Sequence, residues 1–262
     1  VFMKTIFVVC ALVLVLAGCA STGSKPASEV DADPAVQRNP AAAEAARTVG
    51  EAYLAGGNLI AALRELKKAE LLNPDDYITM FDIGLVYYYR GRYDQAVEYL
   101  QRAIRLKPGY APAINSLGNT YSEMGEWDKA IEAYERIIED AFYGTPHFAL
   151  SNMALAYYQK KELDQAERYF LEALKMNPDF INALAGLGIL YIEQGRYGEA
   201  VSRLERAVRK EPKVAQLHFH LGRAYRGAGN NARAKAEFAR VAELEPDSPL
   251  AAEAQRELRQ TP

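Results

Sequence analysis

Apolar and small residues recur along residues 43–248 with a helical period, inside a longer repeat of about 34 residues. Most units carry a glycine three residues before a tyrosine, and every unit has an alanine nine residues after that tyrosine. The alanines are Ala62, Ala96, Ala130, Ala166, Ala200 and Ala234, spaced by 34, 34, 36, 34 and 34 residues. Because residues three or four apart share a helix face, this pattern predicts two amphipathic helices in each of six units.

The residue types at these positions predict how the two helices of a unit pack. A bulky residue follows each alanine by four positions: Leu66, Leu100, Tyr134, Phe170, Leu204 and Phe238. We expect the small residues to let the two backbones approach and the bulky ones to fill the space beside them. A glycine suited to a left-handed helix end follows most first helices, but the fourth unit has Lys161 there.

These signature positions resemble the tetratricopeptide repeat over almost all of residues 43–248. The resemblance implies an all-α fold, a right-handed α-solenoid of six helix pairs. The expected repeats are residues 43–76, 77–110, 111–146, 147–180, 181–214 and 215–248. In residues 249–262, Leu250, Ala254 and Leu258 form one apolar stripe, which predicts a C-terminal capping helix over the last repeat.

The third repeat departs from the pattern between residues 140 and 147. It has Phe142 in place of the usual proline and carries two extra residues. One interpretation is a tolerated surface insertion. The other is a bend or a loop that presents Phe142 and Tyr143 to a partner.

The first 18 residues have the features of a secretory signal peptide, with Lys4 followed by a short apolar run. The run ends in Leu-Ala-Gly-Cys at residues 16–19, which resembles the bacterial lipobox. That resemblance implies cleavage before Cys19 and a diacylglycerol lipid on its thiol, and the alternative is a plain signal peptide. No aspartate follows Cys19, which in such signals favours the outer membrane. Residues 19–42 then form the lipidated cysteine and a flexible tether.

Composition narrows the possible functions further. The net charge is −3, so no basic excess is available for nucleic acid, and two cysteines with three histidines are too few for a typical zinc site or disulfide framework. We find no nucleophile–base set and no glycine-rich phosphate loop. The sequence therefore predicts a protein that is not an enzyme and needs no cofactor apart from the acyl lipid at Cys19.

The remaining candidate is a surface. In tetratricopeptide repeat arrays the first helices line a concave groove, at the second, fifth, ninth and twelfth positions of each unit. With the adjacent Tyr89, the predicted groove residues are Ile78, Phe81, Leu85, Tyr88, Tyr89, Asn115, Asn119, Phe148, Leu155, Tyr158, Ile189 and Ile192. The first helix of repeat two is apolar on nearly all sides, which favours a partner segment in the groove. The alternatives are packing against neighbouring first helices and occupation by the tether. A carboxylate clamp fits poorly, because Asn119 has no accompanying lysine.

The whole plan is similar to the type IV pilus biogenesis and stability lipoproteins, the pilotins of the PilF, PilW or Tgl type. The plan is a lipobox, a short tether, six repeats and a longer junction after the third repeat. This resemblance implies an outer-membrane lipoprotein on the periplasmic face, anchored only by its lipid, whose client is a secretin subunit or another pilus-assembly protein. A generic periplasmic adaptor for envelope hydrolases, proteases or assembly machinery is the alternative.

Overall fold

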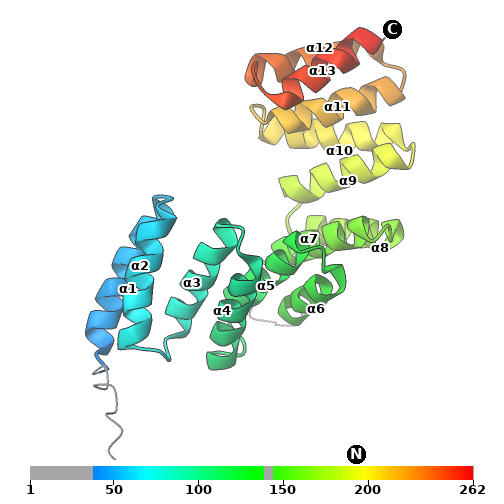
Figure 1. Cartoon of the computed structure of the whole chain (residues 1–262). Helices are drawn as coiled ribbons and strands as arrows, with labels where there is room; N and C mark the ends of the chain where they lie inside the picture. The colour runs from blue at the N-terminus through cyan, green and yellow to red at the C-terminus, as the bar shows by residue number, and fades with distance from the viewer. Residues whose placement is uncertain (1–37, 139–143, 262) are drawn as a thin grey trace, which may run out of the picture. The chain divides into compact units, whose positions relative to one another are not determined.

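The computed structural model describes residues 38–138 and 144–261 and contains thirteen α-helices and no strand in that part of the chain (Figure 1). The helices are α1 (Pro40–Ala55), α2 (Leu59–Leu72), α3 (Tyr77–Tyr89), α4 (Tyr93–Leu106), α5 (Ala111–Glu123), α6 (Trp127–Ile138), α7 (Pro146–Gln159), α8 (Leu163–Met176), α9 (Ile181–Glu193), α10 (Tyr197–Lys210), α11 (Ala215–Gly227), α12 (Asn231–Leu244) and α13 (Pro249–Gln260). The predicted six helix pairs and the added C-terminal helix are confirmed.

The helices form a row in which each contacts its neighbours in the chain. Successive first helices also contact each other, from α1 and α3 through to α11 and α13, whereas successive second helices make no such contact within the described residues. First helices therefore lie closer together than second helices, so the face that they form is the inner one. The predicted groove positions belong to this face.

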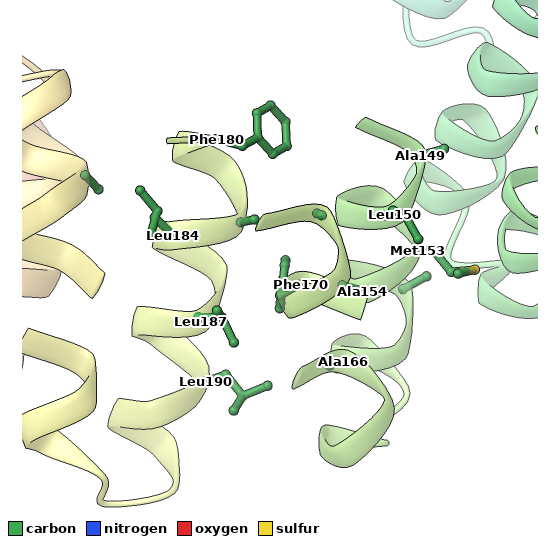
Figure 2. Packing of buried hydrophobic residues seen from close by; sticks show 14 of the residues in the cluster. Ala149, Leu150, Met153, Ala154, Ala166, Phe170, Phe180, Leu184, Leu187 and Leu190 are labelled. Atoms are coloured by element: carbon green, nitrogen blue, oxygen red, sulfur yellow. The ribbon is translucent and has the colours of Figure 1, made fainter. Parts of the chain in front are cut away.

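The core confirms that small residues let paired helices approach. A Cβ atom added to Gly84 of α3 would lie 2.8 Å from Leu100 Cγ of α4, and one added to Gly118 would lie 2.5 Å from the Tyr134 ring. In repeat four, Ala154 takes the place of the glycine, and Phe170 of α8 is fully buried between α7 and α9 (Figure 2). These positions therefore set the spacing of each pair.

The last helix closes the array as the sequence predicts. Ser248 caps α13 by accepting a hydrogen bond of 3.0 Å from the Ala251 amide, and α13 packs on α12 and α11. Ala251 and Ala254 are buried, while Leu250 and Leu258 are half-buried. The apolar end of repeat six is thereby covered.

The first helix begins earlier than the expected repeat boundary at residue 43. Helix α1 begins at Pro40, because the Asn39 side chain caps it by accepting from the Ala42 amide and proline suits the first turn. Cys19, the signal peptide and most of the tether lie outside the described residues, as do Phe142 and Tyr143. No helix in the described part of the chain is long and apolar enough to cross a membrane.

Lys161 adopts the conformation that glycine supplies in the other repeats. Its φ is 65°, close to the 67–78° of Gly57, Gly91, Gly125, Gly195 and Gly229. The same two turn hydrogen bonds form, from the Lys161 amide to Tyr158 and from the Glu162 amide to Tyr157, each 3.0 Å long. The position in the turn, not the residue type, therefore imposes this strained conformation on Lys161.

We expect Lys161→Gly to raise the free energy of unfolding by roughly 0.5–1 kcal/mol. A left-handed conformation costs a residue with a side chain about 1–2 kcal/mol, and the greater freedom of glycine in the unfolded chain offsets part of the gain. The matched control is Gly195→Ala, where φ is 73° and no atom would lie within 4 Å of the new Cβ. That control should lose a similar amount in urea unfolding, and an unchanged or lower stability of Lys161→Gly would contradict the assignment.

Candidate functional site

A hollow on the face of the first helices, called the main hollow below, lies among α3, α5, α6 and α7. Its volume is about 530 Å³, and three predicted groove residues line it: Tyr88, Asn119 and Leu155. It is also lined by side chains outside the predicted set: Ser122, Glu123, Trp127, Tyr134, Asn152 and Gln159. The surface of this hollow is thus aromatic, amide and hydroxyl in character, with one carboxylate.

Asn119 organises the floor of this hollow. Its Oδ1 accepts a hydrogen bond of 2.7 Å from the Tyr134 hydroxyl and one of 2.9 Å from Asn152 Nδ2. The Ser122 hydroxyl lies 3.3 Å from the Tyr134 oxygen. These bonds tie α5, α6 and α7 together and fix the orientation of the amides.

Tyr134 is a core residue that also reaches the site. Its ring is buried at the position where other repeats have leucine or phenylalanine, and its hydroxyl faces Asn119. Its position in the repeat predicts a core residue alone. Tyr134 is the one tyrosine among the six equivalent positions, so its hydroxyl is the sequence feature that could have indicated this second role.

A smaller hollow of about 60 Å³ continues the site toward α3. Leu85, Tyr88, Tyr89, Ser116 and Asn119 line it, so it shares two residues with the larger hollow. Tyr89 is 61% exposed, and its ring contacts that of Tyr88 edge to face. An apolar surface therefore adjoins the polar hollow directly.

Phe81, another predicted groove residue, serves packing, and Ile78 and Asn115 do not line the main hollow. The Phe81 ring meets Tyr110 edge to face with 5.4 Å between ring centroids, and it packs against the core. Ile78 is half-buried, and Asn115 Oδ1 is buried without a hydrogen-bond partner. For Phe81, packing against Tyr110, the residue directly before α5, describes its contacts better than a free groove surface does.

The predicted residues of the C-terminal repeats lie away from the main hollow, apart from Leu155. Phe148 is 44% exposed, and its ring meets that of Phe180 edge to face. The Tyr158 hydroxyl donates to Glu193, and Ile189 is half-buried. Ile192 lines a separate hollow of about 260 Å³. The structure therefore divides the predicted groove into separate sections.

A charged cluster lies between α1 and α3, at the N-terminal end of the same face. Arg47 pairs with Glu51 at 2.5 Å and with Asp76 at 3.3 Å. Asp82 is 6% exposed, and its Oδ2 has no hydrogen-bond partner. Burial raises the pKa of Asp82 to about 7; the Glu51 carboxylate adds to the rise, and the Arg47 guanidinium opposes it.

We expect the stability of this chain to depend on pH through Asp82. Its folded pKa is raised above the unfolded value of about 3.9, so the protonated form stabilises the fold at low pH. That contribution is lost as pH rises toward about 7, at about 1.4 kcal/mol per pKa unit. Urea unfolding at pH 5 and pH 8 measures this. Between these pH values the wild type should lose more free energy of unfolding than Asp82→Asn does, and an equal change in the two proteins would contradict the prediction.

Two of the three histidines, His218 and His220, are buried in α11. His218 Nδ1 lies 2.6 Å from Glu237 and its Nε2 lies 3.0 Å from the Pro212 carbonyl, so both ring nitrogens have structural partners. Burial lowers the pKa of His220 to about 4. Within the described ranges, no group of three histidine, cysteine or acidic residues could hold a metal ion.

Among curated proteins, the similarity covers only part of each chain. Mouse DnaJ homolog subfamily C member 7 is 28% identical over 90 residues, 34% of this chain and 18% of that protein. Human tetratricopeptide repeat protein 7B is 31% identical over 87 residues, 33% of this chain and 10% of that protein. The match thus spans less than a fifth of the length of either relative.

Solved structures resemble this chain over most of its length. PilW, a widely conserved type IV pilus biogenesis factor, has a TM-score of 0.75 at 19% identity, with 81% of this chain and 98% of that chain covered. Pseudomonas aeruginosa PilF has 0.72 at 21%, covering 83% and 98%. The Cut9–Hcn1 hetero-tetramer of APC/C has 0.72 at 19%, covering 86% and 44%. At these identities the likeness establishes the fold.

Matches to protein-family models identify the family of this chain. Two profiles of the tetratricopeptide repeat match, one at residues 76–141 and 109–179 and the other at residues 157–213 and 191–258. Together they span more than half of the chain, from the second repeat into the capping helix. The chain belongs to the tetratricopeptide repeat family.

Proposed function

We propose that this protein is a lipid-anchored pilotin that captures a type IV pilus secretin subunit at the periplasmic face of the bacterial outer membrane. The observation that carries the proposal is the likeness to PilW and PilF over 98% of each of those chains, with no repeat left over on their side. The lipobox-like residues 16–19 support it, because they supply the anchor that such a role needs.

The chemistry of the inner face supports binding rather than catalysis. Tetratricopeptide repeat proteins are generally scaffolds that bind protein partners. The main hollow and the smaller hollow beside it, which Leu85 and Tyr89 line, offer aromatic rings, amides and hydroxyls. These groups suit an extended or helical protein segment. A lipid at Cys19 would confine the groove to the membrane surface and raise its effective concentration toward a client there.

A general periplasmic adaptor is the second candidate. The observation in its favour is that Cut9–Hcn1, a component of an unrelated assembly, matches this fold with the same TM-score as PilF. Such an adaptor would use the same face for a hydrolase, a protease or an assembly machine. The identity of the captured client separates the two functions.

We expect Cys19→Ser to move the protein from the membrane to the soluble periplasmic fraction, because the acyl chains supply the anchoring energy at about 0.8 kcal/mol per buried CH₂. Cell fractionation with immunoblotting measures this. Cys10→Ser, inside the leader, is the matched control and should leave fractionation unchanged. Wild-type and Cys19→Ser proteins that fractionate alike would remove the lipid anchor from the proposal.

The client is tested by affinity purification of the lipidated chain from its native membrane after cross-linking, with mass spectrometry of the bound proteins. We expect a secretin with the wild type and at least a tenfold loss with the double variant Leu85→Glu and Tyr88→Glu, because two carboxylates would disrupt the apolar surface. Circular dichroism should stay helical. Recovery of other envelope machinery without a secretin would favour the adaptor, and full capture by a folded double variant would place binding elsewhere.

A further inference from the structure

We propose that the hollow among α3, α5, α6 and α7 binds an arginine or lysine side chain of the partner segment, held by Glu123, while an adjacent apolar side chain of that segment packs on Leu85 and Tyr89. This inference rests on the proposed function, because it describes the segment that the groove recognises. It goes further by stating the charge and the apolar neighbour that such a segment must carry.

Glu123 gives the hollow its charge. Among the described residues that line it, Glu123 is the one charged side chain, and no lysine or arginine is present to neutralise it. Within the described residues, Glu123 forms no ion pair. Its field reaches the neighbouring rings: burial raises the pKa of Tyr88 and the Glu123 carboxylate adds to that rise. The site is therefore negative and open to a cation.

Glu123 lies at a position in its helix where a carboxylate without an ion pair is unfavourable. Glu123 is the last residue of α5, where the helix dipole disfavours a negative charge. Glu193 occupies the same position in α9, and there the Tyr158 hydroxyl donates to the carboxylate. In repeat two the residue equivalent to Tyr158 is Tyr88, and among the described residues it forms no hydrogen bond to Glu123. The hydroxyl that does approach Glu123 belongs to Tyr93 of α4, at 3.5 Å, which is too long for a strong hydrogen bond. A bound cation would supply the missing interaction.

The rest of the hollow suits the flat, donor-rich head of an arginine. Tyr88 and Trp127 line the hollow, and a cation is attracted to the face of an aromatic ring within about 6 Å. Asn152, Gln159 and Ser122 add side-chain oxygens that accept hydrogen bonds, whereas a guanidinium offers five donors and no acceptor. The same lining accommodates a lysine with fewer bonds.

The smaller hollow determines which kind of side chain lies next to the basic residue of the partner segment. The small hollow that Leu85 and Tyr89 line shares Tyr88 and Asn119 with the large one, so both are reached by neighbouring side chains of one segment. Leu155 is 43% exposed and borders the large hollow from α7. The expected segment is therefore basic at one position and apolar at an adjacent one.

The test is a selection of twelve-residue peptides from a randomised display library on the purified full chain, in mild detergent. We expect arginine or lysine to be enriched next to an apolar residue, and we expect Glu123→Gln to remove the basic preference. Glu98→Gln, an exposed glutamate on α4, is the matched control and should keep it. Trp127 is the one tryptophan of the chain, so its fluorescence reports binding of a selected peptide in this hollow.

A peptide variant without the positive charge makes the test quantitative. Replacing the selected arginine by citrulline should weaken binding to the wild type at least tenfold and to Glu123→Gln less than twofold. The melting temperature of Glu123→Gln should equal or exceed that of the wild type, because the variant removes a carboxylate from a helix C-terminus. Loss of binding together with lower stability would instead indicate a structural role and overturn the proposal.

The outcomes also separate this inference from the proposed function. Peptides that bind the wild type but not the Leu85→Glu and Tyr88→Glu double variant, and that carry no basic preference, would overturn the inference and leave the groove function standing. An equal basic preference on Glu123→Gln would overturn it as well. Peptides without a basic residue that bind the double variant as well as the wild type would overturn both.

Discussion

The close contact between a small residue of each first helix and a bulky residue of the second is the constraint on which the rest of the structure depends. A Cβ atom at Gly84, Gly118 or Gly188 would lie 2.4–2.8 Å from the facing side chain, so the paired backbones are as near as packing permits. This contact sets the spacing of each pair, and the contacts between successive first helices set the inner face. Every hollow on that face follows from these distances, because the side chains of the first helices project into the space that the pairs leave.

One of these packing positions also shapes the site. In repeat three the bulky residue is Tyr134, whose ring fills the core and whose hydroxyl bonds Asn119 at the floor of the main hollow. The polar site is thus fastened directly to the element that holds the helix pair together. Residues that recognise a partner are most selective when packing fixes their orientation, and Asn119, Asn152 and Ser122 meet that condition here.

Two features of the chain lower its stability, and they differ in whether a bound partner could offset the loss. Lys161 takes a left-handed conformation that glycine would adopt without strain, and its Nζ lies 5.2 Å from the centroid of the Tyr158 ring. Glu123 places a carboxylate that forms no ion pair with the described residues at a helix C-terminus, in a hollow lined by aromatic side chains. The first cost is a property of a turn on the chain surface. The second stands at the inner face, where a cation from a partner would relieve it.

The sequence by itself determined the number of helices, their pairing and their packing positions, because all of these follow from short-range periodicity and from residue size at fixed offsets. It also singled out Tyr88, Asn119 and Leu155, since each stands at a groove position of its own repeat. What it could not determine is which positions of different repeats share one hollow. Tyr134 and Asn152 join the site through hydrogen bonds to Asn119, over 15 and 33 positions of the chain, and Trp127 lines the same hollow. Phe81 packs against Tyr110 in the same way, through a contact between distant positions. The rotation and spacing of neighbouring helix pairs decide those contacts, and only the tertiary structure contains that information.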